Sequence, residues 1–193
     1  MEIIIMSNTK IVIVDMVNGF VKEGALHDEH IMGIVDNIKS LIDHKRDADI
    51  IVLEDNHEDN CMEFNSFPVH CLNGTSESKT IDELQYVFGL DNFKACVHKN
   101  STNGIFKLID NKLIDEGEYV LVGCCTDICV MQLALALKTY GNEYNKDIKV
   151  KVIEDACDTY HASYHDRNEY EKASKLVMSV AGVEIAKLDD YLK

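Results

Sequence analysis

Short apolar runs alternate with amphipathic segments along this chain, and this alternation constrains its fold more than any other feature. Runs rich in β-branched residues predict strands at residues 10–15, 49–54, 95–99, 118–123 and 148–153, and a weaker run predicts a sixth strand near 183–188. Continuous runs such as IVIV and IIVL are typical of strands that are buried on both faces. Strands of this kind occur in parallel sheets that are covered by helices.

Amphipathic segments between the strands complete the pattern. They span residues 29–46, 104–116, 127–142 and 167–182, and each is long enough for a helix that covers a sheet. The alternation therefore predicts an α/β fold, a parallel-sheet sandwich with helices on both faces and right-handed crossovers. The chain has one proline, ten glycines and no linker-like stretch, so we expect residues 1–193 to form a single domain.

The charge of the chain disfavours two classes of partner. It has 34 acidic and 19 basic residues and a formal net charge of −15, which would repel nucleic-acid phosphates and anionic lipids. The N-terminus lacks the features of a signal peptide, and no stretch reaches the length of a membrane span. We therefore expect a cytoplasmic homo-oligomer that binds a small molecule rather than nucleic acid or membrane.

The seven cysteines are odd in number and irregularly spaced, so a disulfide framework is disfavoured. Free cysteines are most often buried packing residues, and we interpret most of the seven in this way: Cys61, Cys71, Cys96, Cys124 and Cys157. Cys129 in the segment GCCTDICV is different. Thr126 or Asp127 can cap the predicted helix, which places Cys129 in its first turn, where the helix dipole lowers a thiol pKa. A nucleophile is therefore favoured over packing for Cys129.

Three reactive side chains fall at the carboxyl ends of predicted strands, where open parallel sheets bind their ligands. The first strand ends in Asp15, the third ends in Lys99, and the fourth leads into the helix of Cys129. Asp15 can act as general base for the thiol, and Lys99 can stabilise the thiolate. Taken singly, Asp15 could equally cap a turn and Lys99 could equally be a solvated lysine. Their convergence favours a catalytic group.

Residues 55–80 contain a long predicted loop without clear periodicity, and loops of this length in compact domains are often functional. Asp55 and His57 are two positions apart in an extended segment and therefore point the same way. With His70, and with Glu63 as an additional candidate, they offer mixed nitrogen and oxygen ligands for one divalent metal ion. Zinc is the first candidate, and iron, manganese or magnesium are alternatives. An acidic, solvated loop without a metal is the competing interpretation.

Five segments of the chain form a specific set. They are IVIVDMVNGF, the D-x-H of EDNHED, FPVHCLNGT, VHKN and GCCTDICV. Together, and in this order, they resemble the isochorismatase-like cysteine hydrolases, and within them the nicotinamidases. The resemblance covers almost the whole chain and implies the Rossmann-like sandwich of that family. It also implies a catalytic triad of Asp15, Lys99 and Cys129.

The same resemblance implies the remaining site residues. The metal ligands would be Asp55, His57 and His70, with Glu63 at a position where some members add another ligand. The backbone amides of Cys125 and Cys129 would form the oxyanion hole, with a cis peptide bond between Cys124 and Cys125. The positions that line the nicotinamide ring in the family are occupied here by Phe20, Leu26, Phe67 and Phe106.

These inferences predict a metal-dependent cysteine amidohydrolase that converts nicotinamide and water to nicotinate and ammonia through a thioester. The family pattern D-x-Q-N-D-F is DMVNGF in this chain, and Phe67 replaces the commoner tryptophan. A hydrolase of another small amide or carbamoyl compound is therefore an alternative. A metal-binding or thiol-redox protein without hydrolysis is a second alternative, and a catalytically idle scaffold, which the intact triad argues against, is a third.

Overall fold

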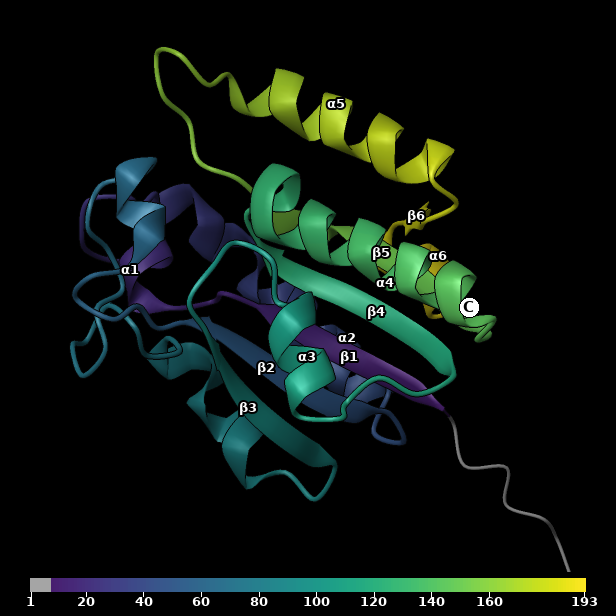
Figure 1. The fold of residues 1–193 in the computed structure, drawn as a ribbon. Helices are drawn as coiled ribbons and strands as arrows, with labels where there is room; N and C mark the ends of the chain where they lie inside the picture. Colours follow the sequence, from purple (N-terminus) through teal and green to yellow (C-terminus); the bar gives the residue numbers. More distant parts are fainter. Residues whose placement is uncertain (1–7) are drawn as a thin grey trace, which may run out of the picture.

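The computed structural model describes residues 8–193, and a six-stranded parallel sheet forms the centre of this part of the chain (Figure 1). The strands lie in the order β3-β2-β1-β4-β5-β6. Their bounds are β1 Thr9–Val14, β2 Asp49–Asp55, β3 Phe93–Lys99, β4 Gly117–Cys124, β5 Ile148–Asp158 and β6 Glu184–Ala186. Every neighbouring pair is parallel, so the predicted α/β fold is confirmed.

Helices cover both faces of the sheet. One face is packed by α2 (Val35–His44) and α6 (Leu188–Tyr191), and the other by α3 (Ile105–Asp110), α4 (Met131–Tyr144) and α5 (Arg167–Val180). Figure 1 shows α3 and α4 in front of the sheet and α2 behind it. Further helical segments complete the fold: α1 (Asn18–Val21), η1 (Glu29–Ile34), η2 (Met62–Asn65), η3 (Asp82–Gly89) and η4 (Thr126–Val130).

Strand β1 lies at the centre of the sheet and divides the core into two halves. Its side chains alternate between the faces: Ile11 and Ile13 join the cluster on the α2 side, whereas Val12 and Val14 join the cluster on the α4 side. All four are at most 1% exposed, and burial of each such side chain contributes about 1.5–3 kcal/mol. Because β1 pairs with both β2 and β4, the residue after it lies at the middle of the carboxyl edge.

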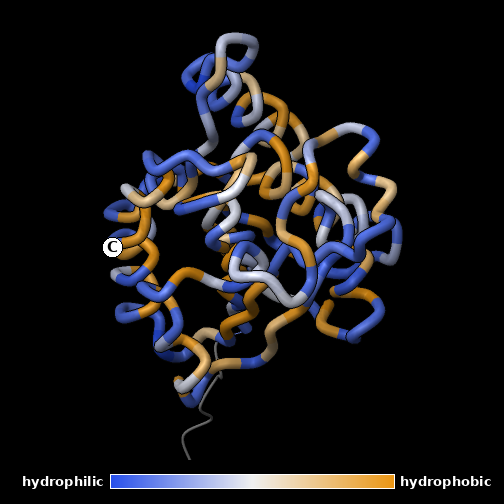
Figure 2. The backbone as a smooth tube through the Cα atoms, turned by 90° about the vertical axis from the view of Figure 1, so that its left-hand side faces the viewer, coloured by the Kyte–Doolittle hydropathy of each residue, from blue (hydrophilic) through white to orange (hydrophobic). Residues whose placement is uncertain are grey.

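The helices are shorter than predicted, although Figure 2 shows the expected alternation of hydrophilic and hydrophobic residues along them. The segment predicted as one helix over 29–46 begins as the 3₁₀ helix η1 and continues as α2. The helix predicted over 104–116 ends at Asp110, because the chain turns through Lys112 in a left-handed conformation with φ of 56°. The segment 127–142 begins with the π-helical turn η4 before α4.

The prediction that the N-terminus is not a signal peptide falls partly on residues 1–7, which lie outside the described residues. The single-domain organisation of residues 1–193 stays a prediction. In residues 8–193, none of the helices combines the length and the apolar character needed to cross a membrane. All seven cysteines are free thiols.

Candidate active site

Asp15 occupies the centre of the carboxyl edge, directly after β1. It is fully buried, and its backbone is in the left-handed conformation with a φ of 49°. Its Oδ1 accepts a hydrogen bond from the Asp55 backbone N–H at 3.0 Å, and its carbonyl accepts one from the Cys124 thiol at 3.1 Å. Gly123 allows β4 to approach this closely, because a Cβ atom there would clash with the Val14 carbonyl. Asp15 is therefore held from both neighbouring strands, through its carboxyl group from β2 and through its backbone carbonyl from β4.

Lys99 lies between two buried carboxylates. Its Nζ is 2.8 Å from Asp15 Oδ2, forms an ion pair with Asp55, and donates a hydrogen bond to the Ser101 carbonyl at 3.1 Å. The Sγ atom of Cys129 lies 3.8 Å from the same nitrogen. Burial lowers the pKa of Lys99, but the charges of Asp15 and Asp55 outweigh it and raise the pKa well above its usual value. Lys99 is therefore a permanent cation at the bottom of the site.

Cys129 lies in η4, and its environment differs from the predicted one. The residue that precedes the turn is Cys125, and neither Thr126 nor Asp127 caps it through a side chain, so that prediction is wrong. Asp127 is instead engaged by His165, whose Nε2 lies 2.8 Å from Asp127 Oδ2. Burial raises the pKa of the Cys129 thiol, and the Lys99 ammonium only partly opposes this. The predicted lowering of the thiol pKa is also wrong, and Cys129 needs a base.

The two carboxyl groups beside Lys99 differ in their affinity for protons. Burial and the neighbouring Asp55 carboxylate raise the pKa of Asp15 to about 7, against the effect of Lys99. Burial acts on Asp55 as well, but the positive charge of Lys99 outweighs it and holds the pKa of Asp55 below its usual value. Oxygens of both carboxyl groups lie within 4.8 Å of Cys129 Sγ. Asp15 can therefore accept the thiol proton near neutral pH, while Asp55 remains a carboxylate.

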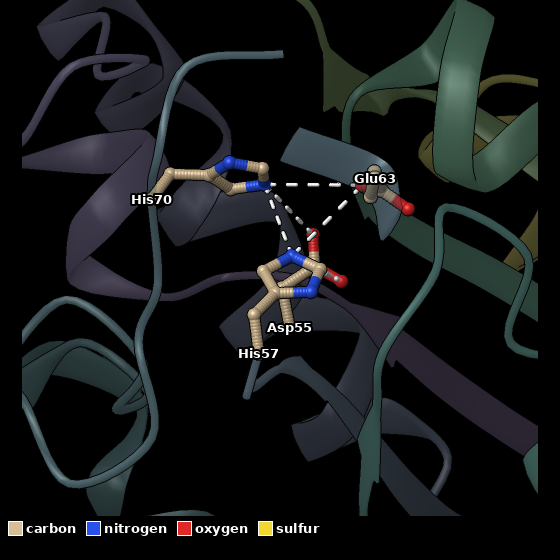
Figure 3. A group of neighbouring side chains, drawn as sticks. All are labelled: Asp55, His57, Glu63 and His70. Carbon is tan, nitrogen blue, oxygen red and sulfur yellow. Dashed lines mark hydrogen bonds and ion pairs between the residues drawn. The ribbon is translucent and has the colours of Figure 1, made fainter. Parts of the chain in front are cut away.

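A second group of side chains meets beside this triad, at the start of the long segment after β2. Asp55 ends β2, His57 and His70 follow in the loop, and Glu63 comes from η2. Figure 3 shows that the four side chains point toward one another. The two histidine Nε2 atoms are 3.1 Å apart, and Glu63 Oε1 lies 3.9 Å from each. The Asp55 oxygens lie 3.7 Å from His57 and 3.8 Å from His70.

The hydrogen bonds around the two histidines assign their tautomers. The Nδ1 of His70 lies 2.7 Å from the Pro68 carbonyl, and the Nδ1 of His57 lies 3.3 Å from Asn100 Oδ1. Both partners are acceptors, so each Nδ1 carries the proton and each Nε2 presents a lone pair. Two lone pairs and two carboxyl groups then face one another without a donor between them. Two nitrogen and two carboxylate ligands suit a divalent ion of the zinc type, and the four residues fit the metal implied by the family resemblance.

A cavity of about 160 Å³ opens over both groups. Three of the four predicted ring-contacting residues, Phe20, Leu26 and Phe67, line it together with Cys125 and Cys129. The remaining lining residues are Asp55, Glu63, Ser66, Pro68, His70, Thr102, Ile128, Tyr160 and Tyr164. The cavity thus brings an apolar, aromatic lining together with the Cys129 thiol and with Asp55, Glu63 and His70 of the histidine cluster. The peptide bond between Cys124 and Cys125 is cis, as expected from the resemblance.

Phe106 does not belong to this cavity, so its assignment to the substrate pocket is wrong. The helix α3 directs Ile105 and Leu108 into the core, where they are 6% and 0% exposed. Phe106 is adjacent to Ile105 on the helix and therefore points away from the core. It is 61% exposed.

Tyr160 and Tyr164 line the cavity but were not predicted from the sequence. Both follow β5, whose carboxyl end lies at the same edge as those of the other strands, and this position is the signal that could have identified them. His165 fixes this segment. Its ring stacks on Tyr160 at 4.0 Å and on Tyr170 at 3.8 Å, and its Nε2 faces Asp127 near the nucleophile.

Comparison with known protein families supports the sequence resemblance. The family model described as the isochorismatase domain matches residues 9–184, which include every residue of the triad and of the histidine cluster. The chain belongs to the isochorismatase-like hydrolase family. Membership places the carboxyl-edge cavity described above in a family of hydrolases, and it leaves the substrate open.

Individual relatives of the family are distant. Nicotinamidase 1 of Arabidopsis thaliana is 28% identical over 157 residues, which are 70% of this chain, and the chain spans only 63% of that relative. A nicotinamidase/pyrazinamidase from Acinetobacter baumanii superposes with a TM-score of 0.76 at 22% identity, over 96% of this chain and 98% of the other. N-carbamoylsarcosine amidase from Thermoplasma acidophilum gives 0.72 at 21%, over 94% and 97%. The two solved structures show that the fold is shared.

Proposed function

We propose that this family member is a cysteine amidohydrolase that converts nicotinamide and water to nicotinate and ammonia. The observation that carries the proposal is that Cys129 lines an aromatic cavity, with Lys99 3.8 Å from its sulfur and Asp15 paired with Lys99, beside the cluster of Asp55 and the two histidines. The name of the Arabidopsis relative and that of the Acinetobacter structure support nicotinamide as the substrate.

The first chemical step is attack on the amide carbonyl. Asp15, with its pKa raised to about 7, takes the Cys129 proton as the sulfur bonds to the carbonyl carbon. Lys99 stabilises the developing thiolate from 3.8 Å. The carbonyl oxygen gains the negative charge and is held by the backbone N–H groups of Cys125 and Cys129. Each such donor contributes about 3–4 kcal/mol in comparable sites.

The remaining steps release both products. The tetrahedral intermediate collapses, the C–N bond breaks, and Asp15 returns its proton to the departing ammonia. The acyl group is left on Cys129 as a thioester. Asp15 then removes a proton from water, the resulting hydroxide attacks the thioester, and the acid leaves as the thiol is restored. The balance is one amide and one water converted to one acid and one ammonia.

The histidine cluster has a separate role in this scheme. Asp55, His57, Glu63 and His70 would hold one divalent ion, which supplies a Lewis-acidic position at the cavity wall. The protein itself orients the ring through Phe20 and Phe67, which line the cavity beside His70, with ring centroids 5.5 and 6.3 Å from that of the imidazole. Orientation of the amide over the sulfur is a large part of catalysis. Binding in a near-attack geometry removes translational and rotational freedom before the reaction, so the chemical step no longer includes this entropy loss.

The lining of the cavity favours an uncharged substrate. Among the described residues, no Lys or Arg lines the cavity, whereas Asp55 and Glu63 both line it. A substrate with a carboxylate, such as N-carbamoylsarcosine, would find no Lys or Arg side chain in the lining, whereas a neutral aromatic amide meets Phe20, Phe67 and Tyr160.

A coupled ammonia-release assay tests the proposal. The purified chain is supplied with nicotinamide, benzamide, pyrazinamide and N-carbamoylsarcosine, before and after chelation and metal return. Release of ammonia from nicotinamide at the highest kcat/KM supports the proposal. A higher kcat/KM for another amide would overturn the substrate but keep the amidohydrolase, and release from none of them by metal-loaded protein would overturn both.

A further inference from the structure

A second set of metal-type ligands lies on the opposite face of β2 from the cavity. Glu54 precedes Asp55, and consecutive strand residues point to opposite faces. On that face Glu54 meets Cys96 and His98 of β3, and we call these three residues the strand-face cluster. We propose that the strand-face cluster is a second metal site, which binds a thiolate-preferring divalent cation such as Zn²⁺ or Co²⁺. This inference is independent of the proposed function.

The distances within the strand-face cluster suit coordination of one ion. Glu54 Oε2 lies 3.1 Å from His98 Nε2 and 3.3 Å from Cys96 Sγ, and all three ligand atoms lie within 4.8 Å of one another. Tetrahedral zinc with bonds of about 2.0–2.3 Å separates its ligand atoms by roughly 3.3–3.6 Å. A shift of a few tenths of an ångström therefore creates room for the ion.

The backbone holds these ligands in place before any ion binds. Glu54 and His98 are direct partners in the β2–β3 register, and Cys96 lies two positions from His98 on the same face. The other carboxylate oxygen, Glu54 Oε1, accepts hydrogen bonds from the Thr80 N–H at 2.9 Å and hydroxyl at 2.6 Å. Such secondary hydrogen bonds orient ligating carboxylates in metal sites. Ligands on strands are also more precisely placed than ligands on loops.

The ligand types indicate which ions the strand-face cluster would select. One sulfur, one imidazole nitrogen and one carboxylate oxygen suit Zn²⁺ or Co²⁺ rather than Mg²⁺ or Ca²⁺. On binding, the Cys96 thiol loses its proton to solvent and the sulfur bonds to the metal. Cys96 and His98 are exposed, whereas Glu54 is only 6% exposed. The fourth coordination position therefore faces water, and chelators can reach the ion.

Sulfur ligation distinguishes this site from the histidine cluster of the cavity, which offers nitrogen and oxygen only. Cobalt reports the difference directly, because a cobalt–thiolate bond gives an intense charge-transfer absorption in the near ultraviolet. The experiment titrates the metal-free full chain with Co²⁺ and counts bound ions by equilibrium dialysis. Variants are Cys96→Ser and His98→Ala for the strand-face cluster, and His57→Ala and Cys129→Ser for the cavity. His44→Ala, an exposed histidine at the end of α2, is the matched control.

We expect the wild type to show the thiolate absorption and Cys96→Ser to lose it together with one bound ion. His98→Ala should weaken binding at this site at least about tenfold, whereas the two cavity variants and His44→Ala should keep the absorption. Because the His98 side chain is 58% exposed, this variant should fold even if Cys96→Ser does not. A wild type without the thiolate absorption, or an absorption that persists in Cys96→Ser or disappears in Cys129→Ser, would overturn the proposal.

Discussion

The two halves of the candidate site are built on different kinds of structure. Asp15, Lys99 and Cys129 come from the ends of β1 and β3 and from the turn after β4, so the sheet itself sets their spacing. In the histidine cluster only Asp55 belongs to a strand, and the other ligands come from the segment 56–80.

The loop half depends on local hydrogen bonds that the sheet half does not need. The His57 N–H donates to the Cys71 carbonyl at 2.9 Å, and the Asn73 N–H donates to the His57 carbonyl at 2.8 Å. The sheet therefore positions the reactive groups, whereas backbone hydrogen bonds within the loop, between His57 and residues 71–73, position the metal ligands. Lys99 connects the halves through its pairs with Asp15 and Asp55. Substitutions in either half, or at Lys99, should separate the contributions of the two halves to activity, stability and metal binding.

Replacing the nucleophile should have the largest effect and should leave the fold unchanged. We expect Cys129→Ser to lower kcat for amide hydrolysis at least about 10⁴-fold, since removal of a nucleophile disables the whole catalytic unit. Ammonia release and near-ultraviolet circular dichroism measure the two properties. Cys157→Ser is the matched control, because this buried thiol of β5 donates to the Leu121 carbonyl and does not line the cavity. More than a tenth of wild-type activity in Cys129→Ser would contradict the assignment.

Removing the cation that connects the halves should affect both activity and stability. Lys99→Met leaves Asp15 and Asp55 buried without their partner, and such losses cost about 3–5 kcal/mol. Urea unfolding measures the change in the free energy of unfolding. Lys22→Met, which removes a partly exposed surface pair with Glu83, should change it by at most about 1 kcal/mol. Equal effects of the two substitutions would show that Lys99 does not join the halves.

Removing ligands from the loop half should weaken metal binding without unfolding the sheet. We expect His57→Ala and His70→Ala to bind the cavity ion at least about 100-fold more weakly, with only small changes in melting temperature. Elemental analysis should be done on a Cys96→Ser background, so that a second ion does not conceal the loss. His44→Ala is the matched control. If both variants keep the ion and full activity, the cavity cluster is not the metal site.

The pH profile should separate the carboxyl groups of the two halves. With an Asp15 pKa of about 7, kcat/KM should fall about tenfold per pH unit below pH 7, because the base becomes protonated. Its folded-state pKa lies above the usual 3.8, so proton binding by Asp15 stabilises the fold below pH 3.8, and this contribution is lost as pH rises through 7. Asp55 has a lowered pKa, so its contribution is lost instead as pH falls below 3.8.

These pH effects can be measured by comparison with Asp15→Asn. Urea unfolding between pH 5 and pH 8 should show that wild type loses stability relative to this variant as pH rises. A kcat/KM profile that is flat between pH 5 and pH 7 would argue against Asp15 as the base.

Substitutions at the aromatic wall should give the smallest effects. Phe67→Ala should raise KM about tenfold with little change in kcat, since it removes apolar contact with the ring. Phe106→Ala should change neither constant more than about twofold, because this side chain faces solvent. Steady-state kinetics on nicotinamide measure both. An equal rise in KM for both variants would return Phe106 to the pocket.

The sequence predicts the location of a residue in the fold where its place at the end of a strand determines that location. Parallel strands bring their carboxyl ends to one edge, so the convergence of Asp15, Lys99 and Cys129 followed from the predicted strands alone. The sequence does not predict the contacts of a side chain whose partner comes from a distant segment. Asp127 was expected to cap a helix, but His165, which is 38 positions away, engages it. A single sequence does not specify such contacts.

The same limit applies to the substrate pocket. Phe106 matched a family position, yet the inward residues of α3 are its neighbour Ile105 and Leu108. Tyr160 and Tyr164 were missed because their segment has no motif, although it leaves the sheet at the functional edge. The sequence predicts a lowered thiol pKa from the helix dipole and Lys99, but burial of Cys129 outweighs these effects.

The central position of β1 also determines when the site can form during synthesis. Strand β1 pairs on one side with β2 but on the other with β4, and the Cys124 thiol reaches the Asp15 carbonyl across 109 positions of the chain. A nascent chain that ends before β4 therefore exposes one edge of an apolar strand, which favours misfolding and chaperone binding. Asp15, at the end of the first strand of the sheet, acquires its nucleophile only after more than half of the chain has been made.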